Sequence, residues 1–131
     1  MSHFVTVRTE IREREHLLAA LRDLSLEFRE GSNLTVRGDA PGRQTAEIVV
    51  ETGCGSDIGF RRDHAENEYT LVADWYNIEL GTRLRRQEFL GRLQQRYSYA
   101  LVCAQAAEQN LVIEEETTEN GEIVLLLSER G

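Results

Sequence analysis

The chain has 131 residues, of which 40% are apolar and 29% charged, with a single proline. A chain of this length buries roughly two-thirds of its unfolded surface, so we expect one domain, residues 1–131, that needs no disulfide or metal to fold. No apolar run approaches the roughly 20 residues of a membrane-spanning helix, and the N-terminus lacks the pattern of a secretion signal. We therefore expect a cytoplasmic protein with no membrane partner.

The chain is acidic, with a formal net charge of −8. This charge opposes non-specific attraction to nucleic acid and to anionic lipid, so the sequence disfavours nucleic acid as a partner. The 15 basic residues are all arginine, which we attribute to codon usage and not to function. Cys54 and Cys103 are expected to be reduced thiols, because a domain of this size and composition does not require a disulfide.

The N-terminal third predicts a strand, a helix and short extended segments. Residues 3–9 alternate weakly around Val5 and Val7, which favours a strand. Residues 13–24 predict a short amphipathic helix, because their leucines recur at i, i+4 and i+7. Residues 26–28 and 34–37 are expected to be two brief extended segments divided by Gly31-Ser32-Asn33, followed by a loop at residues 38–42.

Three runs with period-two alternation follow, at residues 45–51, 57–62 and 68–74. The short linkers between them suit hairpins, so we predict an antiparallel meander with a polar outer face. The side chains expected to face the core are Ala46, Ile48 and Val50, then Ile58 and Phe60, then Tyr69, Leu71 and Ala73.

The C-terminal third predicts a long helix and a hairpin. Residues 85–109 keep one apolar stripe over nearly five turns, and Asn110 suits a left-handed stop. Residues 111–118 and 122–128 are expected to pair. A two-residue turn would place Ile113 on the face opposite the apolar side chains of the last strand, so we predict a three-residue turn, 119–121, with Gly121 left-handed.

The expected order of elements is β-α-β-β-β-β-β-α-β-β, with one or two of the short strands left open. This order predicts an α+β fold with a mainly antiparallel sheet and two helices packed on one face.

The sequence gives little support to catalytic or metal chemistry. Cys54 and His64 occupy loops separated by a strand, which places them roughly 20 Å apart. The three histidines are scattered, and neither cysteine has a neighbouring ligand at metal-binding spacing. The glutamates at 114–116 alternate on a strand and form no single cluster. We predict no catalytic residues, no metal site and no cofactor, although the absence of an enzymatic role stays open.

Two surface features are the candidate sites for a partner. Arg85, Arg92 and Arg96 lie within about 40° of one another on a helix. Such a basic strip on an acidic protein suits an acidic partner or a phosphate, and the alternative is a solvated face. The second feature is Asp74-Trp75-Tyr76, where an exposed tryptophan and tyrosine beside a carboxylate would form a binding edge. The alternative is that Trp75 caps the core.

Several further segments carry a resemblance. They are Met1-Ser2-His3-Phe4, Val36-Arg37-Gly38, residues 46–50, Asp57-Ile58-Gly59-Phe60, Tyr69 with Leu71-Val72-Ala73-Asp74, and Arg96-Tyr97 with Tyr99. Together they resemble an uncharacterised conserved family of cyanobacteria, of algal plastid genomes, where it is a hypothetical chloroplast reading frame, and of other bacteria. Two features depart from the family pattern: no aromatic follows Gly38, and Asn110 stands where a glycine is usual. The family has no assigned active site.

The resemblance implies work within a protein assembly, because family members are often encoded near a small ferredoxin, another small uncharacterised protein and sometimes an AAA-type ATPase. Our leading hypothesis is a non-enzymatic accessory domain that binds another protein. The alternative is a small-molecule-binding or enzymatic domain, with Tyr69, Asp74, Tyr97 and Tyr99 around a pocket between sheet and long helix. A third hypothesis, nucleic-acid binding on the sheet face, lacks the paired exposed aromatics that stack bases.

Overall fold

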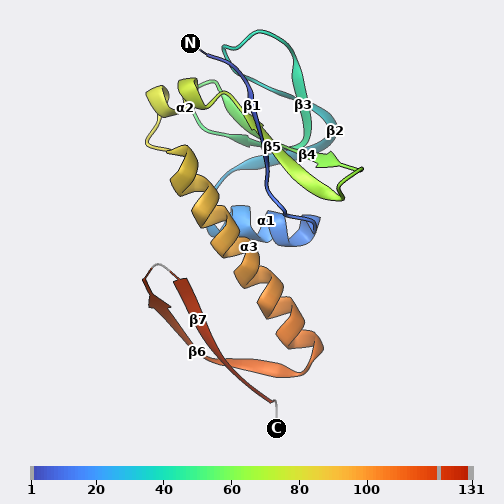
Figure 1. The fold of residues 1–131 in the computed structure, drawn as a ribbon, viewed down its shortest axis with the longest axis vertical. Coiled ribbons are helices and arrows are strands. Elements are labelled where there is room, and N and C mark those ends of the chain that lie inside the picture. The colour runs from blue at the N-terminus through green and yellow to red at the C-terminus, as the bar shows by residue number, and fades with distance from the viewer. Residues whose placement is uncertain (1, 121, 130–131) are drawn as a thin grey trace.

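The computed structural model describes residues 2–120 and 122–129 and has the α+β architecture that the sequence predicts. This part of the chain contains three helices and seven strands (Figure 1). In order, they are β1 (Val5–Arg8), α1 (Arg14–Asp23), β2 (Phe28–Val36), β3 (Gln44–Glu51), β4 (Asp57–Asp63), β5 (Glu68–Ala73), α2 (Trp75–Gly81), α3 (Arg86–Glu108), β6 (Leu111–Glu119) and β7 (Glu122–Glu129).

Five strands form one antiparallel sheet in the order β1-β5-β4-β3-β2. Its three central strands, β3, β4 and β5, are the meander that the period-two alternation predicts. The N-terminal strand β1 pairs with β5, so that Val5 lies opposite Ala73. All six residues of β5 are buried, so this strand has cover on both of its faces.

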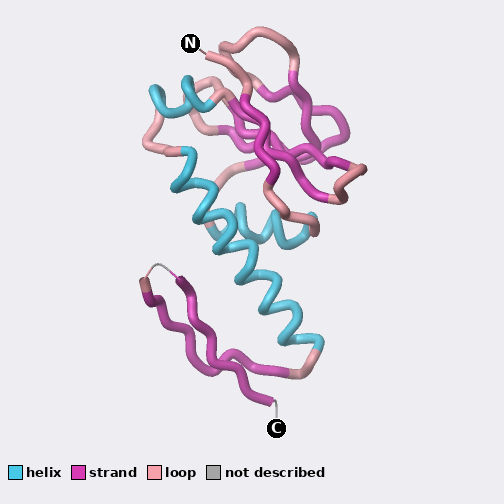
Figure 2. Tube along the Cα trace, in the orientation of Figure 1, coloured by secondary structure: helices cyan, strands magenta, loops and turns pink. Residues whose placement is uncertain are grey.

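The main core lies between one face of the sheet and the helices α1 and α3 (Figure 2). The predicted apolar stripes of both helices point into it, which places both helices on the same face. The largest fully buried side chains of this core are Ile11, Leu17, Leu21, Ile48, Ile58, Phe60, Leu71, Ile78 and Leu93.

The opposite face of the sheet is not polar, and this prediction was wrong. A second, smaller apolar cluster covers it, formed by Val36, Ala46, Val49 and Val72, with Phe4 and Leu34 packed against them. Ala46 lies in this cluster and not with Ile48 in the main core.

β2 is one strand, so the prediction of two extended segments divided by Gly31-Ser32-Asn33 was wrong. The register with β3 shifts between Glu30 and Leu34, which means that the intervening residues form a bulge within the strand. A bulge adds residues without ending a strand. A glycine- and serine-containing stretch of this kind is therefore easily taken for a loop.

A short helix, α2, follows β5 directly and is absent from the sequence prediction. Asp74 is its N-cap, and its carboxylate accepts a hydrogen bond from the backbone N–H of Asn77 at 3.3 Å. The helix has only 7 residues, too few for apolar periodicity to reveal it. An aspartate at a helix start is the one local signal that the sequence offers.

The long helix α3 confirms the predicted helix to within one residue at each end, and the left-handed Asn110 is confirmed by a φ of 57°. Phe89, Leu93 and Tyr97 are buried on the core. The C-terminal half of the helix runs past the sheet (Figure 1). The stripe residues Ala100 and Ala104 are accordingly only half-buried.

The C-terminal hairpin forms a separate sheet of two strands, β6 and β7. Glu119 pairs with Glu122, so the turn has two residues and the prediction of three was wrong. The predicted conformation of Gly121 lies outside the described residues. A register shift between Ile113 and Glu115 places Ile113 opposite Leu127. This bulge brings Ile113 to the same face as Ile123, Leu125 and Leu127. The three-residue turn was predicted in order to explain that same arrangement.

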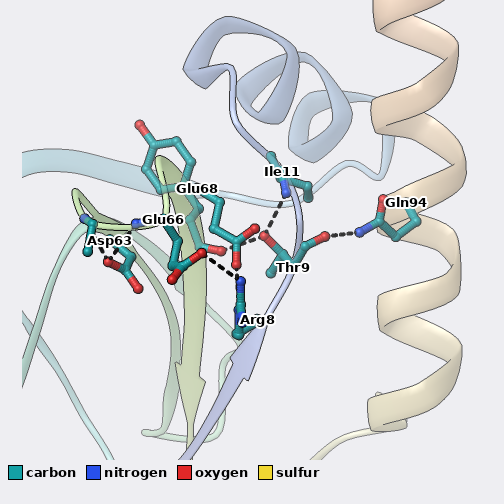
Figure 3. A network of polar contacts seen from close by, with 9 residues as sticks. Arg8, Thr9, Ile11, Asp63, Glu66, Glu68 and Gln94 are labelled. Atoms are coloured by element: carbon teal, nitrogen blue, oxygen red, sulfur yellow. Dashed lines mark hydrogen bonds and ion pairs between the residues drawn. The ribbon is translucent and has the colours of Figure 1, made fainter.

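A polar network fixes α3 and α1 to the edge of the sheet (Figure 3). The hydroxyl of Thr9 donates to the carbonyl of Tyr69 at 2.6 Å and accepts from the N–H of Ile11 at 3.1 Å. The side chain of Gln94 donates to the carbonyl of Thr9. Thr9, the residue after β1, is therefore hydrogen-bonded to β5, to the segment that precedes α1, and to α3.

Candidate functional site

The candidate site is a groove at the N-terminal end of α3, with a volume of about 280 Å³. We call it the arginine groove. Its apolar lining comes from the segment after α1 and from the start of α3, and its charged lining is mainly guanidinium. The lining residues are Leu24, Leu26, Arg83, Leu84, Arg85, Glu88, Phe89 and Arg92.

The apolar floor of the arginine groove continues the main core to the surface. Phe89 is buried and packs against Trp75, with ring centroids 5.7 Å apart. Leu24, Leu26 and Leu84 are half-buried against the same core. The groove therefore has a floor that is already fixed by core packing.

Arg85 is held in place by backbone carbonyl groups between α2 and α3. Its Nη1 donates to the carbonyls of Glu79, Thr82 and Leu84 at 3.1, 3.2 and 2.9 Å. These bonds use one nitrogen of a group that has five N–H donors. The arginine is thus anchored while donors remain for a ligand.

Arg83 and Arg92 complete the basic side of the groove. Arg92 forms an exposed ion pair with Glu88, one helical turn earlier, at 2.9 Å. Arg83 has no ion pair within residues 2–120 and 122–129. An acidic ligand would therefore meet three guanidinium groups. That of Arg83 has no ion pair among the described residues, that of Arg85 is anchored by carbonyl groups, and that of Arg92 is paired with the exposed Glu88.

The predicted basic strip is brought together only in part. Arg85 and Arg92 line the arginine groove, and Arg83, which the sequence analysis did not single out, joins them. Arg96 lies apart, with its guanidinium 5.6 Å from the ring centroid of Tyr99. The missed signal was Arg83 in the short link between the two helices, beside the apolar Leu84.

The hypothesised edge at Asp74-Trp75-Tyr76 is largely buried. Asp74 has no exposed surface and Trp75 is 4% exposed, so the alternative that Trp75 caps the core is the one observed. Asp74 also accepts a hydrogen bond from the N–H of Asp39 at 3.2 Å, besides capping α2. The indole N–H of Trp75 has no partner among the described residues. Tyr76 alone is exposed.

The three tyrosines of the hypothesised pocket take separate positions. Tyr69 and Tyr97 are buried in the main core, and the hydroxyl of Tyr97 accepts from the backbone N–H groups of Arg12 and Glu13. Tyr99 instead lines a pocket of about 580 Å³ between α3 and the hairpin, together with Ile123 and Leu125. Tyr69 and Tyr97 therefore lie between the sheet and the long helix, whereas Tyr99 lies apart from them.

Tyr99 also makes a hydrogen bond to a charged group of the hairpin. Its hydroxyl donates to a carboxylate oxygen of Glu116 at 3.0 Å. This hydrogen bond, with burial as the next contribution, raises the pKa of Tyr99 to about 12. The contact links α3 to the middle of β6.

One group of possible metal ligands is present in the described part of the chain, and the sequence analysis missed it. His16 Nε2 lies 2.8 Å from Glu13 Oε2 and 3.6 Å from Glu15 Oε1. The signal was the spacing of two glutamates beside a histidine at a helix start. Exposed acidic groups of this kind are common in proteins without a bound ion. Cys54 and His64 lie in the loops at opposite ends of β4.

Comparison with known proteins places the chain in a family. A family model described as "Protein of unknown function (DUF1257)" matches residues 20–126. The chain belongs to this family. The uncharacterized protein ycf35 of Cyanophora paradoxa is 30% identical over 128 residues, which cover 97% of this chain and 96% of the relative. No solved structure matches the chain.

Two further relatives carry the same name. The ycf35 protein of Guillardia theta is 31% identical over 134 residues, with coverage of 97% of this chain and 96% of the relative. That of Pyropia yezoensis is 31% identical over 109 residues, covering 83% and 81%. These matches confirm the resemblance that the sequence motifs indicate. No helix in the described residues is long and apolar enough to span a membrane.

The motifs that carried the resemblance are mostly structural in this fold. Arg37 binds the buried carboxylate of Asp57. A Cβ added at Gly59 would lie 2.5 Å from a methyl group of Val36, so only glycine fits there. Asp74 caps α2. These residues set the fold, and none of them lines the arginine groove.

Proposed function

We propose that this chain is a non-enzymatic, cytoplasmic protein-interaction domain that holds an acidic and partly apolar segment of another protein in the arginine groove. The observation that carries the proposal is the combination of Arg83, Arg85 and Arg92 with an apolar floor. This combination occurs on a chain whose net charge is −8.

The chemistry of the groove fits a protein segment. Guanidinium groups form paired hydrogen bonds with carboxylates, and arginine is frequent among the residues that dominate interface energies. An apolar floor adds a place for one large side chain of the partner. Aromatic or aliphatic anchors that fill such pockets account for most of the affinity in many interfaces.

The size of the groove favours a side chain over a free cofactor. Small-molecule sites commonly have volumes of roughly 300 to 1,000 Å³ and bury most of the ligand. The groove, at about 280 Å³, lies just below that range. Acidic segments of an assembly partner, such as the ferredoxin or the AAA-type ATPase that the family resemblance implies, suit it better.

The test is affinity purification of the tagged full-length chain from its native host. Wild type is compared with the triple variant Arg83→Glu, Arg85→Glu, Arg92→Glu, and captured proteins are identified by mass spectrometry. We expect a stoichiometric acidic partner with wild type and its loss in the triple variant. Binding should weaken as salt rises, because exposed charge pairs are screened.

The control is Arg96→Glu, which reverses a single charge on α3 outside the groove. It should keep the partner. The proposal fails if no stoichiometric partner is captured by wild type, or if the triple variant retains it while its circular dichroism spectrum matches that of wild type.

A further inference from the structure

The C-terminal part of the chain carries large apolar side chains that the described residues leave exposed. Among the described residues from 107 to 129, none is buried. Val112, Val124 and Leu126 are 36%, 43% and 52% exposed. They are three of the five large apolar side chains that are exposed in the described chain, and the other two, Tyr76 and Leu80, lie on α2.

These three side chains share the outer face of the hairpin. Strand pairing puts Leu126 opposite Glu115, Val124 opposite Thr117 and Val112 opposite Ser128. Ile123 and Leu125 alternate with them and line the pocket against α3. We call the face with Val112, Val124 and Leu126 the outer face. In Figure 1 the hairpin lies beside the lower half of α3, away from the main sheet.

A two-stranded hairpin with one bare apolar face is an incomplete unit. Isolated hairpins are marginally stable in water, and sheets become stable when an apolar face is packed against a further layer. Here α3 lies against the inner face, with a pocket of about 580 Å³ between them. The outer face therefore has the composition of an interface and no layer over it within the described chain.

The charge of this region identifies the kind of partner. Residues 98–129, which we call the C-terminal arm, contain seven acidic and no basic residues, which gives them a net charge of −7 of the total −8. The acidic residues are Glu108, Glu114, Glu115, Glu116, Glu119, Glu122 and Glu129.

None of these glutamates forms an ion pair with a cation of the described residues. Glu116 accepts from the Tyr99 hydroxyl and Glu114 from the Ser128 hydroxyl, both neutral donors. A surface of this charge attracts cationic proteins over long range and repels anionic ones. A second copy of the chain brings another −7 to the same place, so charge opposes pairing of two arms.

We propose that the outer face of the C-terminal arm binds a basic, amphipathic segment of a partner protein. Apolar side chains of that segment pack on Val112, Val124 and Leu126, and its lysine or arginine side chains pair with the surrounding glutamates. This surface is separate from the arginine groove, so the inference does not depend on the function proposed above. The chain then presents a cationic groove at one end of α3 and an anionic apolar face at the other.

The first experiment measures binding of a defined probe to the full-length chain. The probe is a fluorescent peptide of alternating leucine and lysine, and its counterpart alternates leucine and glutamate. We expect fluorescence polarisation to detect the lysine peptide only, with affinity that falls at least 10-fold between roughly 50 and 200 mM salt. Amide chemical shifts in the NMR spectrum should move in β6 and β7 and stay in β2 to β5.

Variants then separate the outer face from general hydrophobicity. The double variant Val124→Ser, Leu126→Ser should weaken binding of the lysine peptide at least 10-fold. The control Tyr76→Ser, Leu80→Ser removes the other two exposed apolar side chains and should leave the affinity unchanged. The double variant Glu115→Gln, Glu122→Gln removes two negative charges. It should therefore reduce the dependence of the affinity for the lysine peptide on salt concentration.

The native partner provides the final test. Affinity purification with wild type and both double variants should return a protein of basic isoelectric point that the Val124, Leu126 variant loses and the Tyr76, Leu80 variant keeps. Equal loss in both variants, equal binding of the two peptides, or shifts centred outside the hairpin would overturn the proposal. So would analytical ultracentrifugation showing a dimer that the Val124, Leu126 change dissociates, because the occupant would then be a second copy.

Discussion

Arg37 binds the carboxylate of Asp57 through two parallel hydrogen bonds from its guanidinium, Nε to Oδ2 and Nη2 to Oδ1, each 2.9 Å long. Asp57 has no exposed surface, and its Oδ2 also accepts from the backbone N–H of Arg37. The pair joins the end of β2 to the start of β4 and raises the pKa of Arg37.

Loss of the Arg37 side chain should destabilise the fold, because it leaves a buried carboxylate with one backbone donor. Removing one partner of a buried pair costs about 3 to 5 kcal/mol. Since Arg37 itself is half exposed, we expect the loss for Arg37→Ala to lie below that range but above the cost of losing an exposed ion pair. Urea unfolding followed by circular dichroism measures this change.

The control for this pair is Arg29→Ala, which removes an exposed ion pair with Glu51 on the same edge of the sheet. Its cost should stay below about 1 kcal/mol. Similar urea unfolding midpoints for Arg37→Ala and Arg29→Ala would contradict the prediction, because the pair with the buried Asp57 would then contribute no more than an exposed ion pair.

Two glycines should respond oppositely to substitution by alanine. At Gly59 a Cβ would lie 2.5 Å from Val36 Cγ2 and 3.0 Å from Ala46 Cβ, so Gly59→Ala should cost about 1 to 3 kcal/mol through overpacking. At Gly91, on α3, a Cβ meets nothing within 4 Å. Gly91→Ala should stabilise the chain by about 0.5 to 1 kcal/mol. Thermal unfolding of both variants checks the sign, and a lower melting temperature for Gly91→Ala contradicts it.

Thr9→Val should lower stability without changing the size of the side chain. The buried hydroxyl donates to Tyr69 and accepts from Ile11, and the substitution leaves both backbone groups without this partner. We expect a loss of about 1 to 3 kcal/mol. Hydrogen exchange should show faster exchange at the Ile11 amide, whereas Thr6→Val, at an exposed position of β1, should leave it unaltered.

The bond from Tyr99 to Glu116 gives the arm a dependence on alkaline pH. The pKa of Tyr99 is raised from 10.0 to about 12 in the folded chain, so the neutral phenol is favoured by folding. This contribution is complete below pH 10 and is lost as pH rises through about 12. Absorbance at 295 nm should show one late-titrating tyrosine, absent in Tyr99→Phe.

Glu116→Gln tests the cause of that shift. The amide still accepts a hydrogen bond but carries no charge, so the late tyrosine should titrate closer to its ordinary pKa of 10.0. An unchanged titration in Glu116→Gln would assign the shift to burial and not to the carboxylate.

The sequence predicted best what depends on periodicity over many residues. The three meander strands and α3 were predicted because alternation and the Phe89, Leu93, Tyr97 stripe persist along them. The 7-residue α2 escaped because a helix of that length has no periodic signature. The bulge at Glu114 was not predicted for a related reason. It shifts the strand register by one residue and so places Ile113 on the same face as Leu125 and Leu127, which the sequence analysis had explained by a longer turn.

The candidate site was predicted less well, because a groove joins residues that lie far apart in the chain. Arg85 and Arg92 were found from their spacing on one helix. Leu24 and Leu26 contribute to the floor from beyond α1, and no local pattern brings them to α3. The burial of Trp75 likewise depends on Phe89, which only the packing of α3 places beside it.

The pairing of Val5 with Ala73 sets the order in which the chain can complete its sheet during synthesis. β1 leaves the ribosome first, yet its hydrogen-bonding neighbour is the last strand of the meander to emerge. The N-terminal segment must therefore wait, unpaired, for more than half of the chain. Long-range pairing of this kind is slow because a large loop must close first. A chaperone that binds nascent chains would meet β1 as an accessible strand throughout that interval.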